Sequence, residues 1–192
     1  MMKIRLMIVE DDEVWMKCLT KFIEKEDDLV VVKKAYNKEQ AIDSVPEMID
    51  VVLLDLTLDD DPANLSGLEV VSQLKEKGLN RIIMLTSWDE EEVILKAFDE
   101  GAMNYVNKTS YRDIPRVVRE AFANKVSIHP DVSSVVINAL TTERKISVLT
   151  PSERQVYTLK EKGLNKVQIA DVLFKSVETI KKQLKKINDK IR

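Results

Sequence analysis

Apolar, β-branched runs alternate with segments of helical periodicity through the first 124 residues, and this alternation restricts the possible folds more than any other feature of the chain. The runs are Arg5–Val9, Val30–Lys34, Val51–Leu54, Arg81–Leu85 and Asn104–Val106. Apolar runs without polar alternation are typical of parallel strands that are buried on both faces. The pattern therefore predicts an α/β doubly wound, flavodoxin-like fold with a five-stranded parallel sheet and five helices.

The predicted helices carry apolar stripes at i, i+3 and i+4 spacing. Three of the stripes are Val14, Cys18, Leu19, Phe22 and Ile23; Val93, Ile94, Ala97 and Phe98; and Ile114, Val117, Val118, Ala121 and Phe122. Cys18 is the sole cysteine, so no disulfide framework is expected, and its place in a stripe predicts a core residue. No apolar run approaches the roughly 18 residues that span a bilayer. We expect no membrane partner and a cytoplasmic location.

The alternation stops after residue 124, and different signals follow. Residues 125–148 predict a linker with one short helix, Pro130–Leu140. Thr150, Pro151 and Glu153 then supply an N-cap, a first-turn proline and a capping-box acid. Residues 149–192 are predicted to form a small all-α domain with helices near 151–162, 166–173 and 177–190. The expected domains are thus 1–124, 125–148 and 149–192.

Charge divides the chain in the same place. Residues 1–124 hold 16 Lys or Arg against 26 Asp or Glu, a net charge of −10, whereas residues 125–192 hold 14 against 7, a net charge of +7. A polyanion is a plausible partner for the basic segment, and a solvated basic surface is the alternative. Charge alone does not separate the two.

Polar side chains follow the predicted strands where each strand ends. Glu10 and Asp11 follow the first strand, Asp55 the third, Thr86 ends the fourth and Lys108 follows the fifth. In an open parallel sheet, ligands bind beyond the carboxyl ends of the strands. Converging carboxylates repel one another unless a cation joins them, and oxygen ligands suit Mg²⁺. A carboxylate is also a competent nucleophile toward phosphorus, and a lysine and a hydroxyl suit the charge of a phosphoryl group.

Four motifs in this order resemble the receiver domain of two-component response regulators. They are IVEDDE at 8–13, LLDL at 53–56, MLTS at 84–87 and YVNK at 105–108. The resemblance implies that Asp55 is the phosphoacceptor and that Mg²⁺ is the cofactor.

The same resemblance implies roles for the neighbouring residues. Glu10, Asp11 and Asp55 would bind Mg²⁺ together with the backbone carbonyl of Thr57, and Lys108 would contact the phosphoryl group. Thr86 and Tyr105 would form the switch that reports phosphorylation. As alternatives, the acids cap helices, Thr86 is ordinary strand content, and Tyr105 is a fixed core residue.

One departure from the receiver pattern lies after Asp55. Gly67 follows twelve residues later, where receivers have the corresponding glycine after eight, and the longer segment contains Asp59, Asp60 and Asp61. Such a loop, reaching to Ser66, would add metal contacts, shield the acyl phosphate or repel the phosphodonor. A passive insertion is the preferred interpretation, because loop extensions cost little free energy. The direction of any kinetic effect stays open.

The last predicted helix has an apolar stripe and a basic face. Val177, Ile180, Leu184, Ile187 and Ile191 lie on the stripe, and Lys182, Lys185 and Lys186 lie away from it. With the shorter helix before it and a turn at 174–176, this spacing is typical of a helix-turn-helix whose lysines enter the major groove. Packing against another protein is the alternative.

The segment from Leu149 to Ile191 resembles the DNA-binding domain of NarL/LuxR-type regulators, through its LT start, the GLN turn, the IA pair and the S-x-x-T motif. The resemblance implies DNA contacts by the following residues: Lys181, Lys182 and Lys185 in the groove, and Asn165, Lys166, Ser176 and Thr179 on the phosphate backbone. Family members often have His where this chain has Gln183.

A second departure from the family concerns a fourth helix used for dimerisation, since this sequence stops at Arg192. Either the chain is truncated, or dimers form through the receiver or the linker helix. The shortened module also resembles region four of sigma factors.

These inferences predict a phosphorylation-controlled, DNA-binding transcription regulator and not an enzyme, although the receiver would catalyse its own Mg²⁺-dependent phosphoryl transfer and hydrolysis. A sensor histidine kinase or a small acyl phosphate would be the donor, promoter DNA the target, and a homodimer the active form. Two rivals remain: a phosphorylation-independent DNA-binding protein whose receiver is a dimerisation scaffold, and a module whose basic helix binds a protein. The sequence leaves open the signal, the cognate kinase, the target promoters, and activation or repression.

Overall fold

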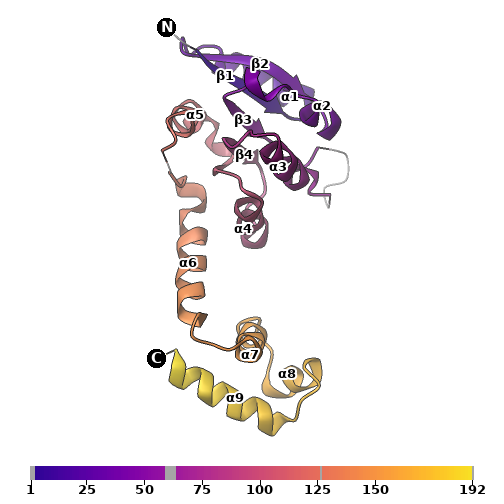
Figure 1. Ribbon diagram of the computed structural model, residues 1–192, viewed down its shortest axis with the longest axis vertical. Helices are drawn as coiled ribbons and strands as arrows, with labels where there is room; N and C mark the ends of the chain where they lie inside the picture. The colour runs from indigo at the N-terminus through magenta and orange to yellow at the C-terminus, as the bar shows by residue number, and fades with distance from the viewer. Residues whose placement is uncertain (1–2, 59–63, 126, 192) are drawn as a thin grey trace. The chain divides into compact units, whose positions relative to one another are not determined.

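The computed structural model describes residues 3–58, 64–125 and 127–191. Its five parallel strands pair in the order β2-β1-β3-β4-β5 (Figure 1). Their bounds are β1 Ile4–Val9, β2 Leu29–Ala35, β3 Val51–Leu54, β4 Ile82–Thr86 and β5 Asn104–Asn107. The order reverses between β1 and β3, so the carboxyl ends of these two neighbours lie at the switch point where ligands bind in open sheets. The predicted doubly wound sheet is confirmed.

Helices cover both faces of this sheet, as Figure 1 shows. They are α1 Glu13–Ile23, α2 Lys38–Ile42, α3 Ser66–Glu76, α4 Glu91–Glu100 and α5 Ile114–Phe122, with short 3-10 helices η1 Pro46–Met48 and η2 Lys108–Asp113. Helices α1 and α5 share one apolar core with the sheet, and α2, α3 and α4 share the other. Two buried faces explain why the strands lack polar alternation.

The prediction that Cys18 is a core residue is wrong. Cys18 is an exposed free thiol, and Val14 is 69% exposed. Helix α1 begins after Asp12, whose carboxylate accepts hydrogen bonds from the Val14 and Trp15 amides. From that start, the side that meets the sheet holds Met16, Leu19, Thr20 and Ile23. The mixed polarity of the helix allowed two overlapping stripes, and the structure buries the one that includes Met16 and not Cys18.

Gly67 holds the start of α3 against the end of β3. Its amide donates a hydrogen bond of 2.8 Å to the Leu56 carbonyl. A Cβ at Gly67 would lie 2.3 Å from the Asp55 carbonyl oxygen and 2.7 Å from that of Leu56, which is closer than carbon and oxygen can approach. The chain therefore returns to the end of β3 at Gly67. The residues Asp59, Asp60 and Asp61 between these points lie outside the described residues, so the prediction about the acidic loop stays a prediction.

Helix α6 spans Pro130–Ile146 and is longer than the helix predicted to end at Leu140. Residues 141–145 continue it because Thr, Glu, Arg and Lys are tolerated on an exposed helix and no Gly or Pro interrupts them. The chain divides into two compact units, Met1–Val136 and Ile137–Arg192, and the division falls inside this helix. Its first turns therefore belong to the N-terminal unit, where Val132 is 1% exposed.

The C-terminal unit contains α7 Pro151–Glu161, α8 Lys166–Val172 and α9 Val177–Lys190, close to the predicted bounds. Two helices of this unit begin with capping boxes, Thr150 with Glu153 as predicted, and Asn165 with Gln168. Its core consists of Leu149, Val156, Tyr157, Ile169, Ala170, Ile180, Leu184 and Ile187. The predicted apolar stripe of α9 faces this core, which leaves the lysines of the same helix on the outside.

In the part of the chain that the structure describes, no helix is both long enough and apolar enough to cross a membrane.

Candidate functional site

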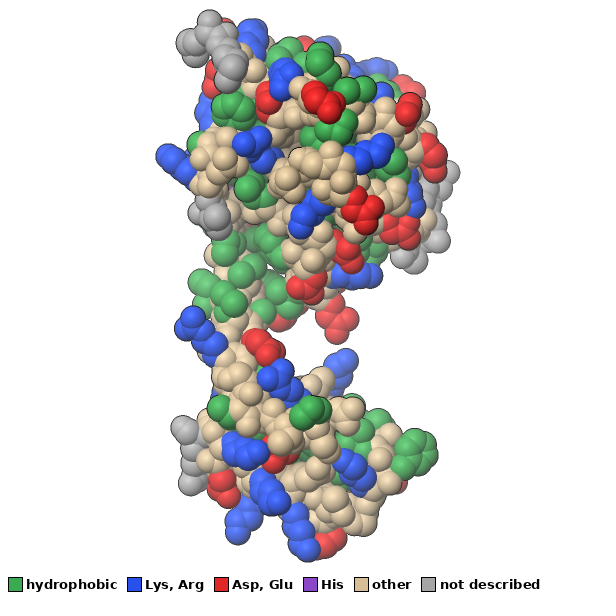
Figure 2. Space-filling model, in the orientation of Figure 1, with side chains coloured by type: hydrophobic (Ala, Val, Ile, Leu, Met, Phe, Trp, Pro, Cys, Tyr) green, Lys and Arg blue, Asp and Glu red, His purple; other side chains and the backbone are tan. Residues whose placement is uncertain are grey.

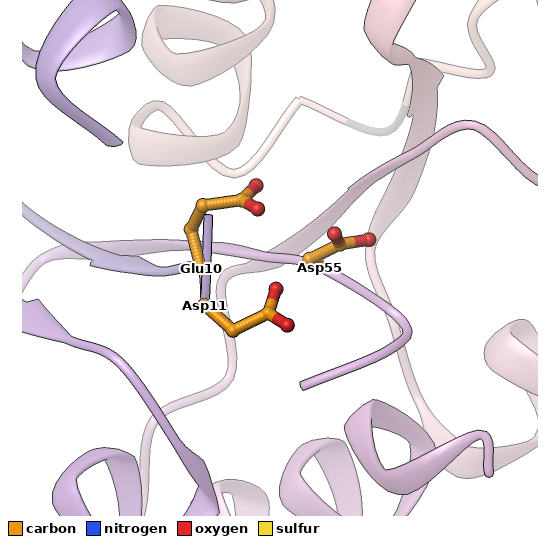
Figure 3. Close-up of side chains that lie close together, drawn as sticks. All are labelled: Glu10, Asp11 and Asp55. Atoms are coloured by element: carbon orange, nitrogen blue, oxygen red, sulfur yellow. The ribbon is translucent and has the colours of Figure 1, made fainter. Parts of the chain in front are cut away.

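Three carboxylates meet beyond the carboxyl ends of β1 and β3. Each of Glu10, Asp11 and Asp55 offers one oxygen within 4.8 Å of the others, and Figure 3 shows the three side chains around one small space. Glu10 is 2% exposed and Asp55 is 5% exposed. Because β1 pairs directly with β3, residues that follow these two strands are brought together by the backbone alone. The predicted acidic pocket is present.

Lys108 joins the two buried acids of this pocket. Its Nζ lies 2.6 Å from Asp55 Oδ2 and 2.7 Å from Glu10 Oε2. The other carboxylate oxygen of Asp55 accepts a 2.6 Å hydrogen bond from the Leu56 amide. Asp55 is thus held by a cation and a backbone donor, which fixes the direction of its carboxylate.

The electrostatics of the pocket reflect burial and mutual repulsion. Burial, followed by the charge of Asp55, raises the pKa of Glu10 to about 7, although Lys108 opposes this shift. The pKa of Asp11 is raised mainly by burial. Burial lowers the pKa of Lys108, but Asp55 and Glu10 together outweigh it and the net pKa is raised. Crowded, partly desolvated carboxylates with raised pKa values gain free energy from a divalent cation, so the oxygen donors fit Mg²⁺.

The predicted switch residues lie beside the pocket. Thr86 ends β4 and is 1% exposed, and its Oγ1 lies 3.4 Å from the Trp88 amide as an acceptor. Tyr105 is also 1% exposed, and its hydroxyl donates a 2.9 Å hydrogen bond to the Trp88 carbonyl. Burial raises the pKa of Tyr105 well above its ordinary value. In this structure the Tyr105 ring is inside the core, and both side chains contact the segment that leaves β4.

The second region of interest is the outer face of α9 in the C-terminal unit. Lys181, Lys182 and Lys185 are all exposed, as predicted. A groove of about 510 Å³ is lined by four lysines and one carboxylate: Lys160 from α7, Lys166 from α8, and Lys181, Lys185 and Asp189 from α9. Figure 2 shows Lys and Arg side chains gathered on this unit. The arrangement places several positive charges where a polyanion can reach them.

Three residues predicted to contact the phosphate backbone have local partners. Asn165 Oδ1 accepts hydrogen bonds from the Val167 and Gln168 amides, which begin α8. Ser176 Oγ accepts from the Thr179 amide at 3.1 Å and lies 2.8 Å from the Thr179 hydroxyl. Asn165 and Ser176 therefore act as N-caps of α8 and α9, and Thr179 is the partner of Ser176 in the first turn of α9. Contact with DNA by Asn165, Ser176 and Thr179 stays a prediction.

Gln183 turns toward α7. Its Nε2 donates a 3.0 Å hydrogen bond to Ser152 Oγ, which also accepts one of 2.8 Å from Lys175. The side chain therefore ties α9 to the first turn of α7 and is not directed outward with the lysines. The unusual residue at this position affects packing within the C-terminal unit.

Residues 6–118 match the family described as the response regulator receiver domain, and this match covers more than half of the chain. The matched segment contains the whole acidic pocket. The chain belongs to the response regulator receiver family.

Relatives of this response regulator extend beyond the receiver. Response regulator protein VraR of Staphylococcus saprophyticus is 27% identical over 194 residues, which cover 99% of this chain and 91% of VraR. The structure is also similar to a LuxR-family two-component response regulator from Aurantimonas, with a TM-score of 0.64 and 25% identity, over 72% of this chain and 99% of that one. A solved complex of RcsB with DNA has the same fold, with a TM-score of 0.66 and 23% identity, and covers 98% and 92% of the two chains.

Sequence reasoning missed one aromatic residue at the pocket of this response regulator. The Trp15 ring centroid lies 5.4 Å from Lys108 Nζ, so the ammonium group is close to the aromatic ring as well as to two carboxylates. Such a contact attracts a cation to the ring. Trp15 stands four residues after Asp11, one turn into α1, and that spacing was a signal that could have identified it.

Lys160 was also missed. It lies in α7, outside the predicted recognition elements, and only the folded arrangement brings it to the groove beside Lys166 and Lys185. No local sequence pattern distinguishes Lys160 from the other lysines of the C-terminal unit, because the approach of α7 to α9 is a tertiary contact.

Proposed function

We propose that Asp55 accepts a phosphoryl group and that this modification controls DNA binding by the C-terminal unit. The chain is a phosphorylation-controlled, DNA-binding transcription regulator of a two-component system. The observation that carries this proposal is the position of Asp55, which is buried, ion-paired to Lys108 and grouped with two further carboxylates. A structural acid would need neither the crowded acids nor the lysine between them.

The geometry of the pocket supports the following phosphoryl transfer. An oxygen of Asp55 attacks the phosphorus of the donor, the bond from phosphorus to the donor breaks, and the electron pair leaves with the donor group. The product is an acyl phosphate on Asp55. Lys108 neutralises charge on the transferred phosphoryl oxygens, and the Thr86 hydroxyl at the end of β4 donates to one of them.

A magnesium ion bound to Glu10, Asp11, Asp55 and the Thr57 carbonyl would supply further positive charge for the phosphoryl oxygens. The carboxylates of this set support the proposal through their proximity. Water reaching the acyl phosphate would reverse the modification, and the receiver would thereby catalyse its own dephosphorylation.

The switch proposal uses the two residues that contact the β4 exit. When Thr86 moves toward the phosphoryl group, it leaves space that the Tyr105 ring can occupy. Tyr105 is already inside and bonded to the Trp88 carbonyl, so we propose that phosphorylation stabilises this inward arrangement and shifts its population. The altered surface then changes pairing or release of the DNA-binding units.

The partners follow from the same reasoning. A sensor histidine kinase donates the phosphoryl group, promoter DNA is bound by the lysines of α9, and the active form is a homodimer. RcsB, which shares this fold, has been solved as a complex with DNA and as two dimers bound to two parallel DNAs, and these arrangements support the proposal. The cytoplasmic location predicted from the sequence stays a prediction.

The deciding experiment replaces Asp55 with Asn. Treated with a small acyl phosphate and Mg²⁺, the native chain should gain one phosphoryl group by intact mass, and its DNA affinity should change; Asp55→Asn should do neither. Asp12→Asn is the matched control, because Asp12 follows Glu10 and Asp11 after β1 but caps α1, and it should keep the phosphorylation. Equal DNA affinity and oligomeric state for the native and Asp55→Asn chains in the presence of the donor would instead favour a phosphorylation-independent scaffold.

The rival in which the basic helix binds a protein is tested by salt. DNA binding through phosphate contacts weakens steeply as salt rises and depends on sequence. If neither dependence is observed for the full chain, the protein-binding rival is favoured.

A further inference from the structure

The first turn of α6 is bonded to β5, although the sequence places it in a linker. The His129 amide donates a 3.2 Å hydrogen bond to Asn104 Oδ1 at the start of β5. At the other end of the strand, the Asn107 amide donates a 2.9 Å hydrogen bond to Asp131 Oδ2. Two contacts from one turn thus hold both ends of a four-residue strand.

The same turn also holds η2, the 3-10 helix that follows β5. Asp131 Oδ1 accepts a 3.1 Å hydrogen bond from the Ser110 hydroxyl, and the Asp131 amide donates to His129 Nδ1 at 3.2 Å. His129 is 3% exposed, and its Nε2 lies 3.0 Å from Asp113 Oδ2. The His129–Asp131 turn is therefore bonded at several points to the segment from Asn104 to Asp113, and we call this turn the clasp. Both ring nitrogens of His129 and both carboxylate oxygens of Asp131 have partners.

This clasp lies next to two residues with proposed roles in the phosphorylation of Asp55, Tyr105 in β5 and Lys108 at the start of η2. Lys108, which contacts Asp55, directly follows Asn107, whose amide bonds Asp131. Tyr105 lies two residues before Asn107. On the other side of the clasp, Val132 is buried in the same apolar core as Tyr105. One turn of α6 therefore contacts the backbone that carries Lys108 and the core that receives the Tyr105 ring.

We propose that Asp131 is a positioning residue: by holding the Asn107 amide and the Ser110 hydroxyl, it sets Lys108 against Asp55 and carries the phosphorylation state into α6. This inference rests on the proposed function of Asp55. A displacement of Lys108 toward a phosphoryl group pulls on Asn107 and thus on Asp131. Because coupling between two sites is reciprocal in free energy, loosening Asp131 also changes the reaction at Asp55.

A purely structural role for Asp131 predicts a different result. An acid in the first turn of a helix interacts favourably with the helix dipole, and that effect alone would stabilise α6 without touching Lys108. The kinetics of phosphorylation at Asp55 separate the two roles, since only a positioning residue affects them.

The test measures the phosphorylation rate of the full chain with a small acyl phosphate and Mg²⁺, for the native protein and for Asp131→Ala, Asp131→Asn and Ser133→Ala. Asp131→Ala should react about fivefold more slowly, as expected when a positioning hydrogen bond is lost. Asp131→Asn keeps one acceptor oxygen and should recover part of the rate. Ser133 lies in the same turn and its hydroxyl donates to the Pro130 carbonyl within α6 itself, so Ser133→Ala should react at the native rate.

Amide hydrogen exchange of residues 130–136 provides the reciprocal readout. Phosphorylation should alter exchange there in the native chain, and this response should be at least halved in Asp131→Ala. A native phosphorylation rate in Asp131→Ala, or unaltered exchange in the native phosphoprotein, would overturn the inference while leaving the proposed function intact. If the native chain gains no phosphoryl group at all, the proposed function itself fails. Should Asp131→Ala not fold, the partial loss expected in Asp131→Asn decides the matter.

Discussion

The acidic pocket and the basic face of α9 use charge in opposite ways. In the pocket, Lys108 is within 2.7 Å of two carboxylates, and both of those acids are at least 95% buried. On α9, the side chains of Lys181 and Lys182 are exposed, and within the described ranges no carboxylate lies at ion-pair distance from either. The first region holds its charges in fixed positions, whereas the second leaves them free.

This difference follows from what each region is proposed to do. Phosphoryl transfer requires charges that are already oriented before the donor arrives, because reorganisation at the moment of reaction raises the barrier. DNA binding requires charges that a long polyanion can reach, and it gains free energy from released counterions without strict geometry. The comparison teaches that burial and pairing mark reaction sites, and exposed unpaired lysines mark polyanion surfaces.

Among the tests of this comparison, removal of the unpaired lysine charges on α9 should have the largest effect. Replacing Lys181, Lys182 and Lys185 together with Gln should lower DNA affinity roughly 10- to 100-fold at low salt and reduce the slope of log affinity against log salt by about 2.7. The phosphorylation rate at Asp55 should stay unchanged. DNA binding measured by fluorescence anisotropy over a salt series provides both numbers.

A matched triple change of exposed lysines in the N-terminal unit, Lys17, Lys21 and Lys25, removes the same charge and should leave the salt slope nearly unaltered. If the two triple variants lose the same affinity, net charge and not the face of α9 governs binding.

A second change would disturb the fixed geometry of the acidic pocket. In Gly67→Ala the new Cβ meets the Asp55 and Leu56 carbonyls, so α3 or β3 must shift, at a cost of about 1–3 kcal/mol in unfolding free energy. Both tryptophans lie in the N-terminal unit, so urea unfolding followed by tryptophan fluorescence reports that unit alone.

Gly78→Ala is the control for this variant. Gly78 has a φ of +93° and open space around it, so alanine there is strained without contacting the pocket. Both variants should lose stability, but only Gly67→Ala should also slow phosphorylation. Equal phosphorylation rates would show that the pocket tolerates movement of α3.

The smallest expected effect concerns Glu153, a carboxylate of the C-terminal unit that is ion-paired with a lysine, as Glu10 and Asp55 are in the pocket. Lys190 and the Thr150 amide lower the pKa of Glu153 to about 2. An acid whose pKa is lowered in the folded state stabilises that state at pH values above its ordinary pKa of 4.5. This contribution is lost as the pH falls from 4.5 toward 2. Amide exchange of α7 and α9 should therefore show a steeper loss of protection over this range in the native chain than in Glu153→Gln. Glu161→Gln, at the far end of α7, should behave like the native chain, and identical pH profiles for all three would contradict the assignment.

The sequence predicted the pocket well because parallel strands place successive strand ends at one edge. Glu10, Asp55 and Lys108 needed only the strand bounds and the crossover rule to be brought together. The three C-terminal helices were also predictable, since their caps are local signals that form within four residues. Both successes rest on short-range or strictly periodic patterns.

Features that depend on tertiary contact were not predictable. The prediction of a buried stripe containing Cys18 was wrong, because two stripes overlap on α1 and only packing against the sheet selects between them. Likewise, His129 and Asp131 appear as linker residues until α6 meets β5, and Lys160 reaches the groove only through the approach of α7. In each case the deciding partner lies far away in sequence or on another element.

The close contact between Gly67 and the end of β3 has a consequence for how such proteins diversify. Because the Gly67 amide bonds the Leu56 carbonyl, the point at which the chain returns to β3 does not depend on the number of residues between Thr57 and Ser66. Lengthening such a loop from eight to twelve residues costs only about 0.4 kcal/mol in closure entropy. The length of this segment can therefore change at little cost in folding free energy, while the contact between Gly67 and the end of β3 keeps the start of α3 in place.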